Sequence, residues 1–436
     1  MDVNRARGAR DFLPPQMHER QGVLDAIRAT FEEHGFEPLD TPAFERIEVL
    51  TGKYGDEGDK LIFKILARGE AGERGECDLA LRYDLTVPLA RVVAMHGELR
   101  MPFKRYHMGP VWRADRPARG RFREFWQCDG DILGTTEPTA EAECLAFAWR
   151  ALDRMGFGDV VLRINDRRLL KALACHLGVE DREGELLIAV DKLDKIGRDG
   201  VSAELEGRGF GAGVVSGLWE VLEGDDDPLE RMGRVLADQP ATAGAVATLR
   251  EVVRRAELLG VPSTSLSIDP TIARGLDYYT GPIWEGVIPG ANMGSVCSGG
   301  RYDGLVGMFS GQDVPAVGIS LGLDRLMVLR EERGLAPKAT SAPVLVTIYD
   351  SENPDPSIRV ARAFREAGIG ADLFPDARKL KAQLKYADQR GYPWIAIVGP
   401  RESEAGTVQI KEAATRAQHD LPVADAIATV RASLAR

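Results

Sequence analysis

Four polar-rich segments constrain the fold of this chain most, because such segments fit poorly in a hydrophobic core. Residues 274–281 read RGLDYYTG and combine a cation, a carboxylate, two phenols and two glycines. Side chains of this kind suit a lined pocket, where charges and phenols point at a ligand. Three further segments share this character: LRYDLTVPLAR at 81–91, WRADRPARGRFREFWQCDGDILG at 112–134 and VGISLGLDRL at 317–326. We expect the fold to bring these distant pieces of chain together into one site.

The pattern of the first 333 residues predicts an α+β domain. Between residues 61 and 133, short apolar runs alternate with charged turns, as in an antiparallel sheet. After Pro14-Pro15, apolar residues at helical spacing predict a helix that ends at His34-Gly35, and residues 136–154 read as another helix. The apolar face of the first helix consists of Val23, Leu24, Ile27 and Phe31. We place a first domain at 1–333, with a helical insertion at about 160–262 that contains none of the polar segments.

The sequence pattern of residues 334–436 predicts a linker followed by a second, smaller domain. Residues 334–342 are rich in Pro, Gly and small residues, which is typical of a linker. Strand-like runs then alternate with helical segments through residues 343–436: VLVTIYD, a helix at 356–367, ADLFP, a helix at 379–390, WIAIVG, TVQIK and a last helix. This alternation predicts an α/β domain with a partly parallel sheet.

The formal net charge of −11 at first argues against a nucleic-acid partner, because phosphate binding requires Lys and Arg. The charge is unevenly distributed, however. Residues 341–436 hold 13 Lys and Arg against 12 Asp and Glu, so the acidic excess lies in the rest of the chain. A tRNA-binding protein needs local basic surface rather than a basic total. Composition alone therefore does not name the partner.

Three features predict a cytoplasmic protein with no membrane partner. No uninterrupted apolar run of about 18 residues is present, so we expect no membrane span. The first twelve residues, MDVNRARGARDF, lack an apolar signal region. The five cysteines are scattered and form no CxxC pair, which indicates reduced thiols rather than disulfides or a zinc site.

Together the polar segments closely resemble the histidyl-tRNA synthetase family, whose members are class II aminoacyl-tRNA synthetases. LRYDLT and RGLDYYTG resemble the two histidine-specific segments of that family, and the resemblance covers nearly the whole chain. The other matching pieces are GARDFLPP at 8–15 (N-terminal segment), GFEPLDTPAFE at 35–45 (motif 1), residues 113–131 (motif 2) and GLDRL at 322–326 (motif 3). The resemblance implies a class II antiparallel-sheet catalytic domain with a helical insertion, and a C-terminal α/β anticodon-binding domain.

The resemblance also implies an enzyme, a histidine–tRNA ligase. Such an enzyme activates L-histidine with ATP and Mg²⁺ to histidyl-adenylate and pyrophosphate, and then transfers histidine to the 3′ end of tRNA(His). It also implies a homodimer whose interface motif 1 builds. The chain has no GxxxxGK[ST] loop, so we expect ATP not to be bound in the P-loop manner. Its six histidines show no metal-ligand spacing, so we predict no metal site made by protein residues alone.

Adenylate formation joins two anionic reactants, so the site must neutralise charge, and arginine grips phosphate bidentately. By resemblance, Arg113 and Arg274 are the catalytic residues. Arg113 would hold the α-phosphate and the substrate carboxylate, and Arg274 would lie beside the reacting phosphorus. The other implied ATP-binding residues are Arg121 and Arg325 (outer phosphates), Phe125 (stacked on adenine) and Asp115, where the bacterial motif usually has Glu.

Recognition of histidine requires side chains whose hydrogen-bonding groups complement those of the imidazole ring. Neutral imidazole has one donor and one acceptor, so an acid facing the donor and a phenol facing the acceptor would reject apolar rings. Asp131 and Tyr279 are the predicted pair, with Tyr278 beside them; for one of the two tyrosines, core packing is an alternative. The implied ligands of the α-amino group are Asp84, Thr86 and Gln127. The full predicted set of histidine-binding residues is Asp84, Leu85, Thr86, Arg113, Gln127, Asp131, Arg274, Tyr278 and Tyr279.

Several alternatives stay open at this point. A regulatory paralogue of ATP phosphoribosyltransferase shares the catalytic fold without aminoacylating, but typically lacks the C-terminal domain. A class II synthetase for another amino acid is a second alternative. The basic residues at 378–390 form either a solvated helix face or a tRNA contact. Ala118 stands where the common bacterial motif has Gln, so the reading of the tRNA acceptor end is left open.

Overall fold

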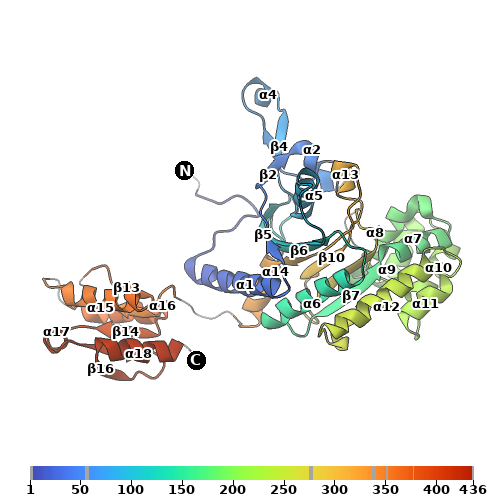
Figure 1. Cartoon of the computed structure of the whole chain (residues 1–436). Helices are drawn as coiled ribbons and strands as arrows, with labels where there is room; N and C mark the ends of the chain where they lie inside the picture. The colour runs from blue at the N-terminus through green and yellow to red at the C-terminus, as the bar shows by residue number, and fades with distance from the viewer. Residues whose placement is uncertain are drawn as a thin grey trace. The chain divides into compact units, whose positions relative to one another are not determined.

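The chain folds into two compact units, and both contain helices and strands, which confirms the predicted α+β class (Figure 1). One unit consists of Met1–Asp11 with Val23–Leu335, and the other of Phe12–Gly22 with Ala336–Arg436. The structure, a computed structural model, describes residues 3–54, 58–273, 278–335, 340–349, 352–376 and 378–434.

The first unit is built on an eight-stranded mixed sheet. The six central strands pair antiparallel, and each edge strand, β1 or β8, pairs parallel with its neighbour. The strands, in their order across the sheet, are β1 (Glu37–Pro38), β5 (Phe103–Trp112), β6 (Glu124–Leu133), β11 (Ala316–Gly322), β10 (Cys297–Arg301), β9 (Pro282–Val287), β7 (Val161–Asp166) and β8 (Leu266–Ile268). Segments far apart in sequence thus become neighbours at β6, β11 and β10.

Amphipathic helices bury one face of this sheet. Helix α6 (Thr139–Arg154) packs on β6, β10 and β11, and α12 (Thr242–Leu258) packs on α6, β7 and β9 (Figure 1). Helix α1 (Pro14–Glu33) follows the predicted bounds closely. Its predicted apolar face is confirmed, because the four residues that compose it are all buried: Val23, Leu24, Ile27 and Phe31.

A group of helices interrupts the sheet between β7 and β8. It begins with α7 (Arg167–His176), whose N-cap Asp166 accepts a hydrogen bond from the backbone of Arg168. The following elements are η1 (Glu180–Arg182), α8 (Glu183–Val190), α9 (Leu193–Gly207), α10 (Ala212–Leu222), α11 (Pro228–Val235), α12 and η2 (Ser263–Ser265). Strand β7 lies inside the range predicted for the insertion but belongs to the main sheet. The helical insertion itself therefore begins after that strand.

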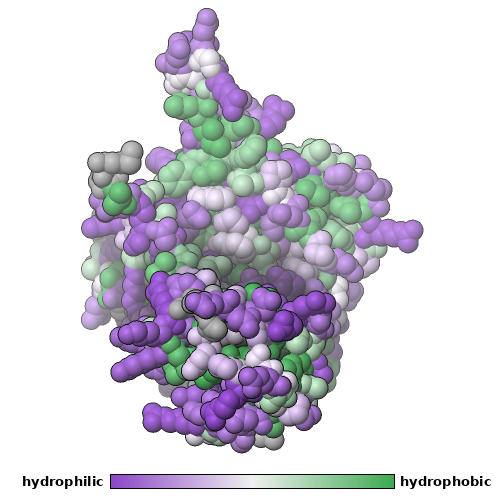
Figure 2. Space-filling model, turned by 90° about the vertical axis from the view of Figure 1, so that its left-hand side faces the viewer, coloured by the Kyte–Doolittle hydropathy of each residue, from purple (hydrophilic) through white to green (hydrophobic). Residues whose placement is uncertain are grey.

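A small projection leaves the main sheet near the N-terminal part of the unit. It is a three-stranded antiparallel sheet of order β2-β4-β3 with short helices. Its end is hydrophilic, and hydrophobic residues gather at its base (Figure 2). The elements are β2 (Phe44–Arg46), α2 (Ile47–Leu50), β3 (Lys64–Leu66), α4 (Glu70–Glu73) and β4 (Cys77–Leu81); the unit also contains α5 (Thr86–Met95), α13 (Gly307–Ser310) and α14 (Leu323–Glu332).

The second unit carries a five-stranded sheet of order β13-β12-β14-β15-β16. Strand β12 pairs parallel with β13 and β14, and the remaining pairs are antiparallel, as expected of a partly parallel sheet. Sequence reasoning did not predict α17 or β16. The elements are β12 (Val344–Val346), α15 (Asp355–Glu366), β13 (Ala371–Leu373), α16 (Leu380–Arg390), β14 (Trp394–Ile397), α17 (Pro400–Ala405), β15 (Thr407–Glu412), β16 (Gln418–Pro422) and α18 (Val423–Leu434). Among the described residues, no helix has the length and apolarity needed to cross a membrane.

Candidate active site

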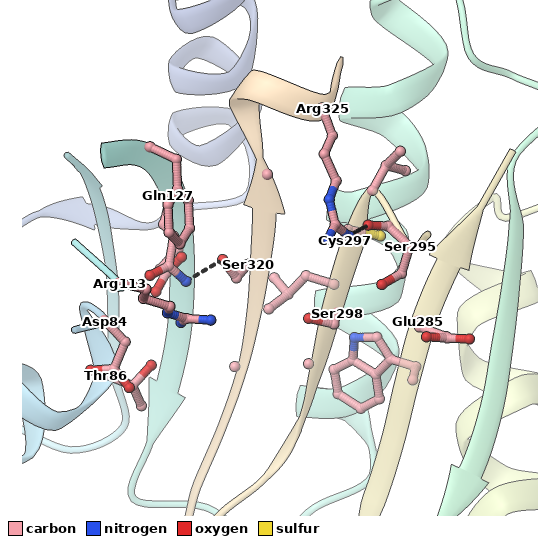
Figure 3. A pocket seen from close by; sticks show the side chains of 18 of the residues that line it. Asp84, Thr86, Arg113, Gln127, Glu285, Ser295, Cys297, Ser298, Ser320 and Arg325 are labelled. Carbon is pink, nitrogen blue, oxygen red and sulfur yellow. Dashed lines mark hydrogen bonds between the residues drawn. The ribbon is translucent and has the colours of Figure 1, made fainter. Parts of the chain in front are cut away.

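A cavity of about 360 Å³ lies on the face of the main sheet that the helices leave uncovered (Figure 3). Its walls come from the loop before α5, from β6, β9, β10 and β11, and from the start of α14. The predicted site residues that line it are Asp84, Thr86, Arg113, Asp115, Arg121, Phe125, Gln127, Asp131, Tyr278, Tyr279 and Arg325. Pieces of chain more than two hundred residues apart in sequence therefore meet in one cavity.

Two of the predicted residues do not join this lining. Leu85 is buried outside the cavity, and its carbonyl accepts a hydrogen bond of 3.1 Å from Arg105. Leu85 therefore supports the site through its backbone. Arg274 lies outside the described residues, so the structure does not place it.

Strand β6 supplies the polar floor of the cavity. Successive side chains of a strand point to opposite faces, so Gln127, Asp129 and Asp131 share one face. All three line the cavity. Cys128 and Ile132, between and beyond them, pack in the hydrophobic core on the other face. The period of two in this strand thus places three polar groups in a row.

Asp131 is held by two partners. Arg105, directly opposite it on β5, is fully buried and places Nη2 2.7 Å from Asp131 Oδ2. The hydroxyl of Tyr302 donates a hydrogen bond to Asp131 Oδ1. Burial raises the pKa of Asp131, and the Arg105 guanidinium opposes that shift. Gly318 lies beside this carboxylate on β11, where a Cβ atom would overlap it.

Like Gln127 Oε1 and Asp131 Oδ2 on the same floor, one oxygen of Asp129 is buried without a hydrogen bond within the described residues. Only 2% of its surface is exposed, and its Oδ1 accepts no hydrogen bond from any residue that the structure describes. Burial raises the pKa of Asp129 to about 7, and the charge of Asp131 adds to the shift, whereas Arg105 opposes it. Sequence reasoning did not select Asp129. The sequence did contain the information needed to select it, because alternate residues of a strand share a face, and Asp129 therefore lies on the same face as Gln127 and Asp131.

Asp84, Thr86, Gln127 and Arg113 gather at one side of the cavity (Figure 3). Asp84 Oδ1 accepts hydrogen bonds from the Tyr54 hydroxyl at 3.1 Å and the Val87 backbone at 3.0 Å. Gln127 Nε2 donates to the Ser320 hydroxyl at 2.9 Å. Within the described residues, Asp84 Oδ2 and Gln127 Oε1 are buried and have no partner. Two unpaired acceptors at one corner suit a cationic ligand group.

Three tyrosine side chains that line the cavity pack against one another. The rings of Tyr278 and Tyr279 lie 5.2 Å apart, and those of Tyr278 and Tyr302 lie 5.7 Å apart, both edge to face. Burial raises the pKa of Tyr279, with a further contribution from Asp131, so its hydroxyl stays protonated near neutral pH. Tyr278 is buried and packs in a hydrophobic cluster, while Tyr279 is only partly buried. The alternative of core packing thus suits Tyr278 better than Tyr279.

The guanidinium of Arg113 is fixed through its Nε atom and through contacts with two aromatic rings. Its Nε donates to the carbonyl of Tyr83 at 3.0 Å, and its Cζ lies 4.3 Å from the Tyr83 ring centre and 5.3 Å from that of Phe125. Its two Nη groups make no hydrogen bond to any residue in the described parts of the chain. A planar fork fixed in this way can grip a carboxylate or a phosphate.

Ion pairs and hydrogen bonds hold the arginines in the loop between β5 and β6 and the arginine at the start of α14. Arg121 lies 3.5 Å from Asp115, and Arg119 forms a two-pronged ion pair with Glu332 of α14. The Arg325 side chain donates to the carbonyl of Ser295 across the cavity from Arg113 (Figure 3). These contacts keep basic side chains at the mouth of the cavity.

Three carboxylates that line the cavity already have arginine partners. Asp115 lies near Arg121, Arg10 pairs with Asp324, and Arg163 Nη1 lies 3.2 Å from Glu285. Across the described ranges, no group of three or more His, Cys, Asp or Glu could hold a metal ion. The cavity therefore offers single carboxylates to a metal but no dedicated cage.

Comparison with known proteins identifies relatives of both units. A family model described as "Histidyl-tRNA synthetase" matches residues 8–326, and one described as "Anticodon binding domain" matches residues 344–433. The chain is 41% identical to the histidine–tRNA ligase of Gloeobacter violaceus, with 96% of each chain covered. The crystal structure of histidyl-tRNA synthetase from Nostoc sp. superposes with a TM-score of 0.87 at 31% identity, covering 99% of this chain and 100% of that one. An ATP phosphoribosyltransferase regulatory subunit/histidyl-tRNA synthetase from Bacillus halodurans shares the fold, with a TM-score of 0.71 at 22% identity over 88% of this chain and 97% of that one.

Proposed function

This chain belongs to the histidyl-tRNA synthetase family and is a histidine–tRNA ligase, and we propose that the cavity on its main sheet is where histidine is activated. The enzyme joins L-histidine to ATP, releases pyrophosphate, and transfers histidine from the adenylate to the 3′ end of tRNA. One observation carries the assignment of the site. The free fork of Arg113 faces the same cavity as the unpaired acceptors of Asp84 and Gln127, which suits a carboxylate and an ammonium on one small molecule.

Arg113 would align the two anionic reactants. A carboxylate oxygen of histidine attacks the α-phosphorus of ATP while the bond to pyrophosphate breaks, so negative charge concentrates at one point. The fixed guanidinium of Arg113 neutralises that charge without reorganising, because its Nε is already bound to Tyr83. We assign Arg274 to the position beside the reacting phosphorus.

The remaining ATP contacts follow from the walls of the cavity. Arg121 and Arg325 would bind the outer phosphates, and Phe125 would stack on adenine. Asp115 would orient Arg121, which lies 3.5 Å away. These roles rest on the placement of all four residues around one cavity.

The other end of the cavity would receive the amino acid. Asp84, Thr86 and Gln127 would bind the α-ammonium group, because two of them present unpaired buried acceptors. Asp131 and Tyr279 would define the end that holds the imidazole ring, with Tyr278 packed behind them. Leu85 would contribute through its carbonyl, which holds Arg105 in place.

Mg²⁺ fits this site as an ion that arrives with ATP. Mg²⁺ keeps several waters and binds phosphate oxygens together with one or two carboxylates. Asp115 and Glu285 are two of the carboxylates that line the cavity, and they would supply that oxygen contact. The bound ion would offset charge on the outer phosphates.

The second unit contains the anticodon-binding domain, and we propose that α16 is part of its tRNA surface. Three basic residues of this helix are exposed, Lys381, Lys385 and Arg390, and Arg378 and Lys379, directly before its first residue, are exposed as well. Such a cluster provides the local phosphate-binding surface that the overall charge of the protein does not.

A homodimer and a cytoplasmic location complete the proposal. Phe44 on β2 and Leu66 on β3 are 52% and 62% exposed on the small sheet. Exposed apolar residues of this kind are typical of a subunit interface. The five cysteines, all within the described residues, form no disulfide, and this is compatible with a reducing compartment.

Histidine-dependent exchange between ATP and pyrophosphate, followed by charging of tRNA, tests the function. We expect exchange with histidine and not with other amino acids, and charging of tRNA(His). A regulatory paralogue would bind histidine without exchange. The curated relatives that match nearly the whole chain are ligases, so that alternative has less support.

A further inference from the structure

Two polar side chains of β7 lie on the same face of the main sheet as the cavity. Arg163 is paired with Glu285 of β9, and Asn165 with Ile283. Glu285 itself lines the cavity (Figure 3). Ile164, between the two polar residues, packs in the hydrophobic core on the other face, as the period of two in a strand requires. Sequence reasoning assigned this stretch to the insertion and gave it no role in the site.

Asn165 binds the segment 269–272, which directly follows β8. Its side chain is buried, and its Nδ2 donates hydrogen bonds to the carbonyl of Pro270 at 3.2 Å and to that of Ile272 at 3.0 Å. Its Oδ1 accepts a hydrogen bond of 2.8 Å from the backbone of Asp166. The amide is therefore held in one orientation, with its donors directed at the backbone of this segment.

Arg163 binds the side chains of the same segment. Its Nε lies 2.5 Å from Asp269 Oδ2, and its Nη2 donates to the Thr271 hydroxyl at 3.0 Å. Its Nη1 lies 2.8 Å from Asp194 of α9 and 3.2 Å from Glu285. One guanidinium thus joins the segment 269–272 to the wall of the cavity and to the helical insertion.

The segment 269–272 leads directly to Arg274. Ile272, which lines the cavity, stands two residues before it in the chain. On the other side of the stretch 274–280, the carbonyl of Gly281 accepts a hydrogen bond of 2.8 Å from the backbone of Arg167, the first residue of α7. The end of β7 and the start of α7 therefore hold both flanks of this stretch. A cation that neutralises charge in a transition state is effective only if its position is fixed beforehand.

We propose that Asn165 and Arg163 are positioning residues for Arg274. The inference rests on the proposed function of the cavity and on the role given there to Arg274, and it adds the residues that fix this role in space. Both side chains would act through the segment 269–272 and not through contact with a substrate. Loss of either should therefore weaken stabilisation of the transition state and leave the binding of ATP and histidine almost unchanged.

Asn165 is the better probe, because its side chain binds the segment and its own neighbour in the chain, whereas Arg163 also binds the cavity wall. Asn165→Ala removes both donors. Asn165→Asp also replaces the amino group but keeps the shape, so either folded variant of the full-length enzyme gives the answer. We expect kcat in histidine-dependent pyrophosphate exchange to fall about 10- to 100-fold, and KM for ATP and for histidine to change less than about 3-fold.

A double variant separates positioning of Arg274 from an independent effect. In an Arg274→Ala background the positioned group is absent, so adding Asn165→Ala should lower the rate by less than about 3-fold. Single-turnover formation of the adenylate measures such low rates. The proposal is overturned if the two effects multiply, or if Asn165→Ala raises KM and leaves kcat unchanged.

Arg231→Lys is the matched control for Arg163→Lys. Arg231 of α11 is also a buried arginine, and its Nε donates to the carbonyl of Val221 while its Nη1 pairs with Asp226, both inside the insertion. We expect Arg163→Lys to lower kcat at least 10-fold and Arg231→Lys to change it less than about 2-fold. Equal losses in the two variants would refute the positioning role. Wild-type protein without histidine-dependent exchange would refute the proposed function, whereas an active wild type with an unaffected Asn165→Ala variant would refute this inference alone.

Discussion

Replacing Asp129 by asparagine removes one buried ionisable group and changes almost no volume. Burial and the neighbouring Asp131 raise the pKa of Asp129 from its ordinary value of 3.8 to about 7, against the opposing effect of Arg105. The folded protein therefore holds a proton on Asp129 more tightly than the unfolded chain does. Asparagine has no such proton, so the two proteins should respond differently to pH.

The sign and size of the effect follow from these two pKa values. A raised carboxyl pKa destabilises the ionised folded state, so the wild type loses stability as pH rises from 3.8 to 7, and the full penalty is present above 7. At about 1.4 kcal/mol per pH unit, the penalty is about 2 kcal/mol at pH 5.5 and about 4 kcal/mol at pH 8. Asp129→Asn should thus gain about 2 kcal/mol over the wild type between these two pH values.

Thermal unfolding of the substrate-free protein at several pH values measures this difference. For a unit of this size, 2 kcal/mol corresponds to a shift in Tm of about 3 °C, so the variant should gain that much relative to wild type between pH 5.5 and 8. Asp78→Asn, at an exposed position on β4, controls for the loss of one negative charge. The reasoning fails if the Tm difference between variant and wild type is the same at both ends of the range, or becomes smaller with rising pH.

Three further predictions concern the proposed roles of larger parts of the protein. Arg274→Ala should cut the rate of pyrophosphate exchange by orders of magnitude while changing ATP affinity far less, and an unchanged rate in a folded variant would remove Arg274 from the mechanism. A protein that ends at Ala339 should keep histidine-dependent exchange but lose most of its charging efficiency and part of its salt-dependent tRNA binding; full charging would contradict the anticodon role. Light scattering should give a dimer of the 47.6 kDa chain at micromolar concentration, and a stable monomer would refute the proposed interface.

Features that depend on neighbouring residues in sequence could be predicted without the structure. The apolar face of α1 follows from helical spacing alone, because residues three and four apart share a helix face. The alternation of strands and helices in 343–436 likewise predicted most of the second unit. The short β16 and α17 were not predicted, because HDLP and PRESEA carry little strand or helix periodicity.

The sequence by itself determined the family, the two-part architecture and eleven of the residues that line the cavity, because its motifs are continuous pieces of chain. Tertiary structure alone decided which side chains each carboxylate of the cavity meets. Asp131 has an arginine and a tyrosine as neighbours, because Arg105 lies opposite it on β5 and Tyr302 reaches it from the end of β10. Asp129, only two residues away, meets neither an arginine nor a tyrosine at its Oδ1. The hydrogen-bonding state of a buried side chain depends on residues that strand register brings beside it, and QCDGD holds no information about that register.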